Sequence, residues 1–403
     1  MCGFLVFKEK GNNFFIQKRG QDKTTNIKIE GFNFIHNLLS VTGTTTIQPF
    51  TDKGIVCLYN GEIYNHKFTK SDGENLIPLY KKYGTQFPKQ LDGEWAIALY
   101  DFNKKIAIFA TDIFATKPIW RNGLECASYE SGVGGHKICA NTIEVVSFKG
   151  EEHSENIHTW DLKQYKDNYN DWINKFEKSI KKRATNNCFI GLSSGYDSGA
   201  IACELTKQKI AFKSFIVEGK EDKSILDQRM AIINNYEYIK NSSDYSNEKE
   251  WINNNIEKFT YIGGEGSIQK DSASLALSKI CRLAHNEKRK VYLSGQGADE
   301  IISDYALFPK QSTFKGEFPK ILNKNLWKNF YNGCQYNYLG KEEYVAGSHS
   351  IETRYPFLDR DLVQEFLWLT PELKNKKYKA PIYEYLKTNN FPFKEGVKIG
   401  LKI

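Results

Sequence analysis

The chain has 403 residues, of which 40% are hydrophobic and 14% aromatic, and a formal net charge of +8. This length can bury the cores of two domains, and the modest excess of 56 basic over 48 acidic residues is spread along the chain, which argues against nucleic-acid binding. No stretch approaches the roughly 20 apolar residues of a membrane helix, and the N-terminus does not look like a signal peptide. We therefore expect a cytoplasmic protein that binds neither nucleic acid nor membrane. Its eight irregularly spaced cysteines are expected to be reduced thiols.

The first third of the chain is rich in predicted strands. Short apolar or alternating runs occupy residues 54–59, 95–102 and 105–112, and turn-forming residues separate them. Residues 74–84 have apolar positions at helical spacing and end in a glycine that suits a helix C-cap. The pattern predicts an α+β domain over residues 1–160, and the polar stretch 149–171 is expected to hold the boundary.

From Trp172 onward the pattern changes to alternating strands and helices. Residues 188–194 precede a periodic run at 200–208, residues 214–219 precede 227–235, and a long helical run at 272–287 leads into 291–295. Repeated units of this kind predict a parallel sheet with helices on both faces. We expect a second, α/β domain over residues 170–403.

Cys2 is a candidate nucleophile because of its position. If Met1 is removed, the thiol and the free α-amine belong to one residue, and an amine that titrates near 8 can take the thiol proton. The alternative is a small apolar residue at the start of a strand. The residues that follow favour the catalytic interpretation.

Four segments, at residues 1–7, 60–66, 71–74 and 91–101, resemble the class II glutamine amidotransferases of the N-terminal-nucleophile type. The resemblance implies an αββα sandwich in which Cys2 attacks the side-chain amide of glutamine. It also implies that the Asn60 side chain and the Gly61 N–H form the oxyanion hole, where fixed donors stabilise the developing charge. Glu62 and Asp72 would hold the amino group and amide of glutamine.

The chain departs from this family at Leu38. The family carries an arginine at this point that clamps the carboxylate of glutamine, and an aliphatic side chain cannot replace a guanidinium. Another cation such as Arg19 could take its place, glutamine binding could be weaker, or the donor could differ. A second family segment is altered here over residues 111–118, which keep Asp112, Lys117 and Pro118.

Two later segments carry signs of nucleotide chemistry. Residues 192–198, LSSGYDS, follow a predicted strand, open a helix and resemble the pyrophosphate-binding loop of the ATP pyrophosphatases; a helix N-terminus offers N–H groups to a phosphate. A serine-rich helix cap is the plainer alternative. Residues 294–300, SGQGADE, resemble the matching element of asparagine synthetases. The resemblance implies Mg²⁺ held by Asp197 and Asp299, and ATP bound by Leu192, Ser193, Gly195, Asp197, Ser198, Val217, Ser294 and Gly295.

A third segment, residues 350–359, resembles another element of the asparagine synthetases. By this resemblance the residues on the acceptor side are Gln296, Glu352, Arg354 and Lys379, and Lys398 is the candidate catalytic lysine of a late segment. Position 296 is often glutamate in asparagine synthetases, and an amide cannot act as a general base. Gln296 therefore argues against aspartate as the acceptor more than it argues against adenylation of a carboxylate.

Nearly the whole chain thus resembles glutamine-hydrolysing asparagine synthetases, ligases of asparagine biosynthesis. We expect it to use glutamine, ATP and Mg²⁺ to convert a carboxylic acid, aspartate in the first instance, to its amide through an acyl-adenylate. Two alternatives stay open: the same chemistry on another acid such as a sugar acid, and a non-catalytic or ammonia-only relative. A homodimer is also left open.

Overall fold

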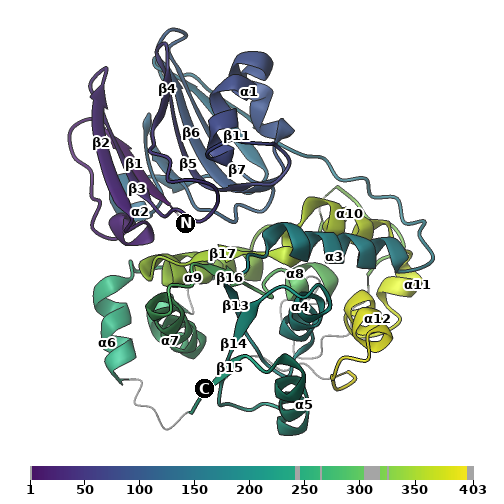
Figure 1. Cartoon of the computed structure of the whole chain (residues 1–403). Coiled ribbons are helices and arrows are strands. Elements are labelled where there is room, and N and C mark those ends of the chain that lie inside the picture. Colours follow the sequence, from purple (N-terminus) through teal and green to yellow (C-terminus); the bar gives the residue numbers. More distant parts are fainter. Residues whose placement is uncertain (1, 241–245, 264–265, 304–317, 325, 397–403) are drawn as a thin grey trace. The chain divides into compact units, whose positions relative to one another are not determined.

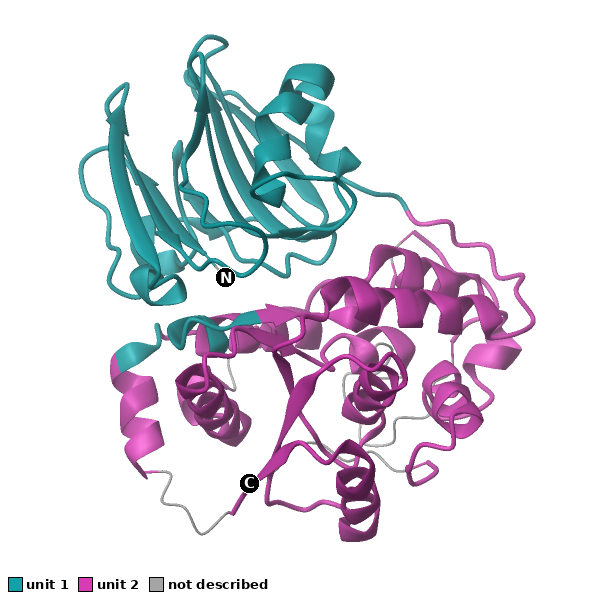
Figure 2. Cartoon of the chain, in the orientation of Figure 1, with its two compact units in different colours: residues 1–159, 255–257, 346–352 teal, residues 160–254, 258–345, 353–403 magenta. Residues whose placement is uncertain are grey.

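The structure is a computed structural model that describes residues 2–240, 246–263, 266–303, 318–324 and 326–396. The described chain forms two compact units, which Figure 2 shows in different colours. Unit 1 comprises residues 1–159, 255–257 and 346–352, and unit 2 comprises residues 160–254, 258–345 and 353–403. Two short segments of the second half therefore cluster with unit 1, which no sequence pattern had indicated.

Unit 1 is built on two six-stranded sheets whose paired strands run antiparallel. The first sheet has the order β10 (His136–Lys137), β8 (Trp120–Asn122), β9 (Glu125–Ala127), β1 (Gly3–Phe7), β3 (Phe32–Leu38) and β2 (Lys23–Ile29). The second has the order β12 (Glu152–Asn156), β11 (Thr142–Ser147), β7 (Ile106–Thr111), β6 (Gly93–Asp101), β5 (Ile55–Ile63) and β4 (Phe50–Asp52).

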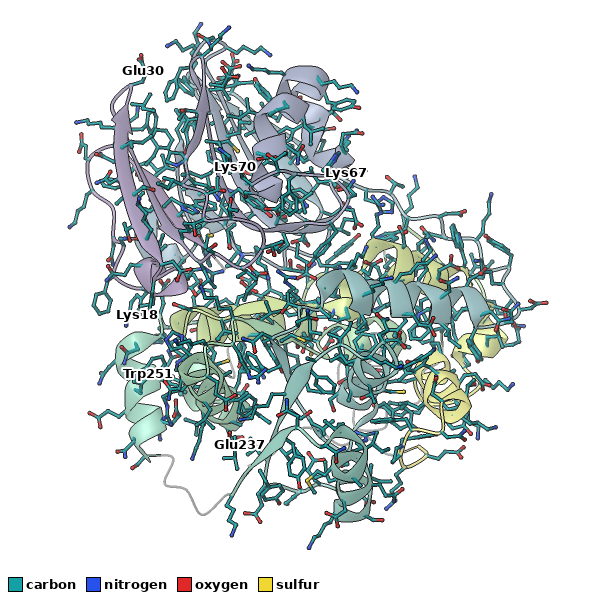
Figure 3. All side chains as sticks on the ribbon, in the orientation of Figure 1. Lys18, Glu30, Lys67, Lys70, Glu237 and Trp251 are labelled. Atoms are coloured by element: carbon teal, nitrogen blue, oxygen red, sulfur yellow. The ribbon has the colours of Figure 1, made fainter. Side chains whose placement is uncertain are left out.

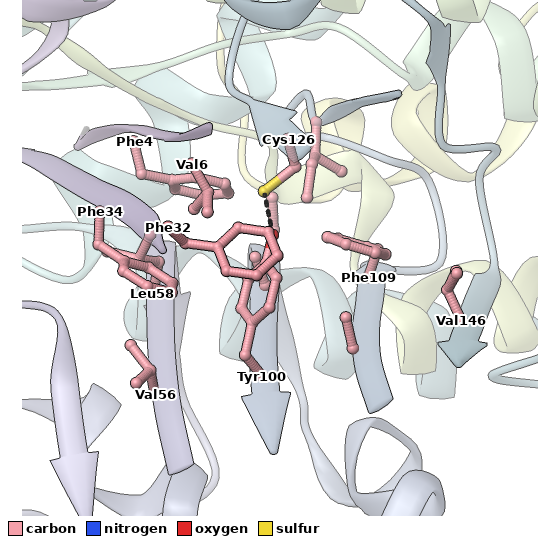
Figure 4. Packing of buried hydrophobic residues seen from close by; sticks show 14 of the residues in the cluster. Phe4, Val6, Phe32, Phe34, Val56, Leu58, Tyr100, Phe109, Cys126 and Val146 are labelled. Carbon is pink, nitrogen blue, oxygen red and sulfur yellow. Dashed lines mark hydrogen bonds between the residues drawn. The ribbon is translucent and has the colours of Figure 1, made fainter. Parts of the chain in front are cut away.

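A core rich in aromatic rings joins the two sheets. Phe4 and Val6 of β1 pack in one cluster with Val56 and Leu58 of β5, because alternate residues of a strand face the same side. Figure 4 shows this cluster, in which the hydroxyl of Tyr100 lies 3.6 Å from the sulfur of a buried cysteine, Cys126.

Helical segments complete the layers of unit 1. The other face of the second sheet packs on α1 (Leu76–Tyr83) and on the 3₁₀ segment η3 (Gly84–Gln90). The 3₁₀ segment η1 (Ile16–Arg19) and the short helix α2 (Glu130–Val133) contact β1 of the first sheet. The predicted order of an antiparallel α+β unit followed by a parallel α/β unit is confirmed.

A strand lies inside the expected domain boundary. The polar stretch 149–171 was expected to hold that boundary, yet it contains β12, which pairs with β11 from Thr142↔Asn156 to Val146↔Glu152. Residues of β12 are mostly exposed. A solvent-facing edge strand has no apolar alternation to reveal it, so tertiary pairing decided its conformation.

Unit 2 contains a five-stranded sheet in the order β15 (Tyr236–Ile239), β14 (Phe212–Val217), β13 (Cys188–Gly191), β16 (Val291–Leu293) and β17 (Glu352–Arg354). The pairs β13 with β14, β13 with β16 and β14 with β15 are parallel, as the alternating pattern predicted. Figure 1 shows α4 (Tyr196–Lys207) and α7 (Ser272–Asn286) on opposite sides of β13.

The remaining helices of the described ranges follow residue 169 and lie around this sheet (Figure 1). They are α3 (Asn170–Arg183), α5 (Lys223–Ile233), α6 (Ser246–Asn255), α8 (Ala298–Ile302), α9 (Cys334–Ser348), α10 (Arg360–Trp368), α11 (Pro371–Lys374) and α12 (Ala380–Thr388). Within the described ranges, none of the helices is both long and apolar enough to cross a membrane. Charged side chains are dispersed over the surface; Glu30, Lys67 and Lys70 of unit 1 are exposed at separate places (Figure 3).

Candidate active site

Strand alternation places Cys2 beside the predicted glutamine-binding residues. Cys2 directly precedes β1, whose Phe4 and Val6 face the core between the sheets. On β5 the residues that face the same core are Val56 and Leu58. Continuing the two-residue period brings Cys2 on one strand, and Asn60 and Glu62 on the other, to the same end of the core.

A hollow of about 400 Å³, part of which is open to solvent, lies at this end of unit 1. Cys2, Gly61, Glu62 and Asp72, all predicted site residues, contribute to its lining. Glu352, predicted for the acceptor side, also lines it, as part of the segment 346–352 that clusters with unit 1. The rest of the described lining consists of Leu38, Leu39, Ser40, Val41, Thr42, Thr44, Thr46, Gln48, Tyr59 and Ser71.

The Cys2 thiol is held as a neutral group. Burial raises the pKa of this thiol to about 11, and the negative charges of Glu352 and Asp72 act in the same direction. The sulfur lies 3.7 Å from the carbonyl oxygen of Leu39, which accepts a hydrogen bond from the thiol. The thiol is therefore protonated at neutral pH. Attack on a substrate therefore needs a base that removes the proton as the new bond forms.

The side-chain amide of Asn60 is buried without hydrogen-bond partners among the described residues. Its side chain is fully buried, and neither its amide nitrogen nor its amide oxygen has a hydrogen-bond partner among the described residues. Leaving a buried polar group unmatched typically costs about 1–3 kcal/mol. Asn60 is not among the lining residues of the hollow, but it directly precedes Gly61 and Glu62, which are. A donor at this position fits the stabilisation of an oxyanion.

Gly61 shows why a glycine follows Asn60. Its φ is +135°, a conformation that favours glycine. A Cβ atom here would lie 1.9 Å from the carbonyl oxygen of Glu94 on β6. The glycine thus allows β5 to turn its peptide at the rim of the hollow and still pair with β6, where Gly61 is opposite Trp95.

The two predicted ammonium-binding carboxylates are fixed by neighbours that sequence analysis missed. Thr42 donates its hydroxyl to Glu62 Oε1 at 2.7 Å. Asp72 Oδ2 accepts from the Tyr59 hydroxyl at 2.5 Å and from the Ile63 N–H at 2.8 Å. Burial nevertheless raises the pKa of Asp72 above its usual value, and the nearby charge of Glu352 adds to this. These partners lie far apart in the sequence, so no local signal pointed to them.

Arg19, the cation that could have replaced the missing clamp, has a different position. It is fully buried and donates from Nε to the carbonyl oxygen of Cys2 at 2.9 Å and from Nη1 to the Tyr129 hydroxyl at 2.7 Å. It does not line the hollow. Arg19 therefore holds the backbone of the predicted nucleophile, and Leu38 is among the residues that line the hollow.

The altered segment 111–118 forms the loop after β7, and its side chains hold that loop against the second sheet. Asp112 accepts from the N–H groups of Trp95, Phe114 and Thr116 at 3.1, 2.9 and 3.0 Å. Burial raises the pKa of Asp112 to about 6. Lys117 lies 3.8 Å from the carboxylate of Glu94, the residue whose backbone packs on Gly61. The residues kept from the family pattern thus support β5 and β6 next to the hollow.

In unit 2, the predicted pyrophosphate loop lies between β13 and α4, where the sequence placed it. The Ser193 N–H donates to the Ser198 hydroxyl at 3.1 Å, and the Gly195 N–H donates to the Ser193 hydroxyl at 3.1 Å. The Ser194 N–H donates to a carboxylate oxygen of Glu221 at 2.7 Å. The donors of the loop thus already bind oxygen atoms, one of them anionic, which a phosphate could replace.

Arg229 of α5 binds the backbone of this loop, a role that the sequence analysis did not predict. It is fully buried, and its guanidinium donates to the carbonyl oxygens of Ser193 and, at 2.9 Å, Gly195. A Cβ atom on Gly199 would lie 2.3 Å from Nη2 of Arg229, so the first turn of α4 needs a glycine there. Burial lowers the pKa of Arg229 to about 10, which keeps the guanidinium charged at neutral pH.

A second hollow, of about 680 Å³ including space open to solvent, adjoins this loop within unit 2. Three of the predicted ATP-binding residues line it: Leu192, Ser193 and Val217. The remaining described lining is formed by Gly191, Phe215, Ala273, Leu277, Ile280, Tyr292, Lys341 and Glu342. Mostly apolar walls with a few polar groups suit a nucleoside.

The two predicted metal ligands meet at one cation. Lys379 Nζ lies 2.6 Å from both carboxylate oxygens of Asp197 and 2.8 Å from Oδ1 of Asp299. Gly295 packs against Asp197, where a Cβ atom would lie 2.9 Å from the Asp197 Cβ, so the two loops are in contact. Two carboxylates around one positive charge are a donor set that fits Mg²⁺, which commonly takes one or two carboxylates plus substrate phosphates. Among the described residues no cluster of three or more metal-binding side chains occurs.

The other acceptor-side residues have separate environments. The backbone N–H of Gln296 donates to the Ser294 hydroxyl at 3.0 Å. The side-chain nitrogen of Gln296 is buried without a described partner. Arg354 Nη1 donates to the carbonyl oxygen of Arg183 at 2.9 Å, and the Arg354 carbonyl accepts from the Ser294 N–H. Lys398 lies outside the described residues.

Comparisons with known proteins agree with this arrangement. The model of the glutamine amidotransferase domain family matches residues 8–132, and that of the asparagine synthase family matches residues 173–335. A solved structure, NMN synthetase from Francisella tularensis, covers 58% of the chain at 12% identity with a TM-score of 0.22, which is too low to bear on the fold.

Several curated relatives are similar over most of the chain. A protein of Methanocaldococcus jannaschii, provisionally named asparagine synthetase [glutamine-hydrolyzing] 1, is 26% identical over 87% of this chain and 72% of its own. Asparagine synthetase [glutamine-hydrolyzing] 2 of Oryza sativa is 26% identical, covering 84% and 62%, and the Homo sapiens enzyme of that name is 25% identical, covering 90% and 74%. The matches thus span between three fifths and three quarters of these relatives' lengths. With both family models in this order, the chain belongs to the glutamine-hydrolysing asparagine synthetase family.

Proposed function

We propose that this chain is a glutamine-dependent, ATP-consuming ligase that converts a carboxylate to an amide through an acyl-adenylate, with aspartate as the first acceptor to test. Residues 1–160 would release ammonia and residues 170–403 would activate the acceptor. Two observations together carry the proposal: the buried thiol of Cys2 lines a hollow with Gly61 and Glu62, and the preceding residue, Asn60, has a buried amide without a described partner. A purely structural domain would have no reason to retain such an amide.

In the first reaction, the Cys2 sulfur attacks the side-chain amide carbon of the donor. Once Met1 is removed, the α-amine of Cys2 can accept the thiol proton and pass it to the departing nitrogen. A thioester forms, the carbon–nitrogen bond breaks, and ammonia leaves; water then hydrolyses the thioester and restores the thiol. Asn60 and the Gly61 N–H would stabilise the oxyanion at each stage, and Glu62 and Asp72 would bind the donor's ammonium group.

In the second reaction, an oxygen of the acceptor carboxylate attacks the α-phosphorus of ATP, and pyrophosphate leaves. Ammonia then attacks the acyl carbon, AMP leaves, and the extra proton goes to solvent. The loop at 192–198 would bind the phosphates and the adjoining apolar hollow the nucleoside. Mg²⁺, held by Asp197 and Asp299, would neutralise phosphate charge. Lys379, already between these carboxylates, is placed to interact with the same phosphates.

The test is pyrophosphate release across a panel of carboxylic acids, with either glutamine or ammonium as the nitrogen source. We expect release that depends on one acid, and loss of the glutamine-driven but not the ammonium-driven reaction in Cys2→Ala. The intact mass should show a chain that begins at Cys2. Aspartate-dependent release with asparagine formation would identify the acceptor as aspartate.

A second candidate differs only in the acceptor. Gln296, with its side-chain nitrogen buried and no described partner, offers a hydrogen-bond donor where a general base would need a carboxylate. Another acid, such as a sugar acid, would then replace aspartate. Release with ammonium but not with any amide, combined with the absence of an adduct on Cys2, would instead indicate an ammonia-only enzyme.

A further inference from the structure

The hollow around Cys2 is acidic. Three of its lining residues are buried carboxylates, with exposed fractions of 6% for Glu62, 5% for Asp72 and 2% for Glu352. Within the described part of the chain, neither lysine nor arginine lines this hollow. Apart from the ammonium group of the N-terminus, whose positive charge lowers the pKa of Cys2, the charges around the hollow therefore favour a cation and oppose an additional anion.

Leu38 gives the rim of the hollow no positive charge that could pair with a carboxylate. Leu38, the last residue of β3, is 7% exposed and lines the hollow with an aliphatic side chain. Arg19, the cation considered as a replacement, binds the Cys2 carbonyl oxygen and the Tyr129 hydroxyl instead. A carboxylate here would lose its hydration without gaining a guanidinium partner, which is unfavourable beside like charges.

Neutral polar groups, by contrast, suit the remaining wall. Residues with hydroxyl side chains contribute to it: Ser40, Thr42, Thr44, Thr46 and Ser71. The hydroxyl groups of Thr42, Thr44, Thr46 and Ser71 already donate to oxygen atoms of the chain, so they are left to accept a hydrogen bond, as from the N–H of an amide. The wall would thus accept an amide where a free carboxylate, which has no N–H to donate, would be rejected.

We propose that the amide donor of this site is a glutamine unit that keeps its ammonium group but whose α-carboxyl is covalently blocked, as in an amide, and that free glutamine is the poorer donor. The inference rests on the proposed ammonia release by Cys2 and narrows its substrate. The ammonium would lie among Glu62, Asp72 and Glu352, and the blocked carboxyl would lie by Leu38 and the hydroxyl groups.

Four amides separate the contributions in the full chain. L-Glutamine has both charges, L-glutamine α-N-methylamide and 4-aminobutanamide have only the ammonium, and 5-amino-5-oxopentanoate has only the carboxylate. The readouts are ammonia release and the mass of the acyl adduct on Cys2. We expect kcat/KM for the α-N-methylamide to exceed that for L-glutamine by about tenfold, the factor that corresponds to one pKa unit of electrostatic penalty. The 4-aminobutanamide should be used and 5-amino-5-oxopentanoate should not.

A pair of variants tests the role of the rim. Leu38→Arg should reverse the preference by raising kcat/KM for L-glutamine at least about tenfold, since charge-assisted bidentate pairs are strong. Leu38→Met keeps an aliphatic side chain and should retain the wild-type preference; thermal melting reports whether each variant folds. Equal use of both donors by the wild-type chain, or a preference for free L-glutamine, would overturn the inference and leave the proposed function intact. Failure of all four amides to give ammonia or an adduct would overturn the proposed function of Cys2 as well.

Discussion

The guanidinium of Arg19 donates to the backbone carbonyl of Cys2, with 2.9 Å between Nε and the oxygen. The same group reaches the Tyr129 hydroxyl at 2.7 Å, and its central carbon lies 4.9 Å from the centre of the Tyr129 ring. A planar group held at two points and by a ring fixes its own orientation and that of the peptide it binds. Arg19 is therefore a positioning residue for the nucleophile.

We predict that Arg19→Lys slows ammonia release by about tenfold to a hundredfold, because a displacement of the nucleophile by about 1 Å can cost that much. Ammonium-driven pyrophosphate release should stay within about twofold of wild type, since the proposed second reaction does not use Cys2. The measurement is kcat for both reactions. Lys23→Met, at an exposed position of β2, is the control and should change neither. A parallel loss of both reactions would mean that Arg19 serves overall folding.

Asn60 should separate activity from stability. Asn60→Leu removes a buried amide that has no described partner, so we expect the free energy of unfolding to stay the same or to rise by about 1–3 kcal/mol. Ammonia release should fall by about 10²- to 10³-fold, as for the loss of other oxyanion donors. Urea unfolding and the rate of thioester formation are the measurements.

The control for Asn60 is Asn37, which is equally buried but has partners. Its Nδ2 donates to Asn13 Oδ1 at 2.9 Å, and its Oδ1 accepts from the Thr24 hydroxyl at 2.9 Å. Asn37→Leu should therefore lower the free energy of unfolding by about 1–3 kcal/mol. If Asn60→Leu destabilises the chain as much as Asn37→Leu does, its amide has a structural role.

Lys379 and Mg²⁺ should compete for the same two carboxylates. Lys379→Met leaves Asp197 and Asp299 without their ammonium partner, so the variant should melt at a lower temperature than wild type without Mg²⁺. Added Mg²⁺ should raise the melting temperature of the variant more than that of wild type, because ligand binding stabilises the folded state. Lys376→Met, at an exposed position, is the control. Identical Mg²⁺ responses in all three proteins would contradict a shared site.

Asp359 should make unit 2 sensitive to acid. Burial alone would raise its pKa, but the adjacent Arg183 and Lys182 lower the pKa of Asp359 to about 2. A depressed pKa contributes stability above the unfolded value near 3.8 that is lost as the pH falls through 2. The contribution is about 2 kcal/mol at pH 7, and about half of it should be gone by pH 3.

The variant for this test is Asp359→Asn, because asparagine can still cap α10, where Asp359 accepts from the Asp361 and Leu362 N–H groups. Its deficit in unfolding free energy relative to wild type should be largest at pH 7 and should shrink between pH 4 and pH 3. Asp227→Asn, on the exposed face of α5, should show no such trend. If the deficit in unfolding free energy does not change with pH, the ion pair of Asp359 is not its cause.

The predicted features that depend on nearby residues agree with the structure. Apolar alternation marked β5, β6 and β7, helical spacing with a terminal glycine marked α1, and strand-to-helix transitions marked the loop at 192–198. Edge strand β12 was not predicted because solvent-facing strands lack apolar alternation. The contact of Arg229 with the loop was not predicted because its partners are backbone carbonyl groups more than 30 residues away.

The sequence by itself determined the order of the two units, the position of the loop at 192–198 between a strand and a helix, and the absence of an arginine at position 38, because each depends on residue types and short spacings. Only the tertiary structure decided that Arg19 is engaged by Cys2 and Tyr129, that Asn60 has a buried amide without a described partner, and that Glu352 joins Glu62 and Asp72 around the thiol. These relationships arise from the packing of strands and segments up to 350 residues apart, whose pairing no local pattern encodes. The electrostatic character of the site, on which the proposed choice of donor rests, follows from that packing.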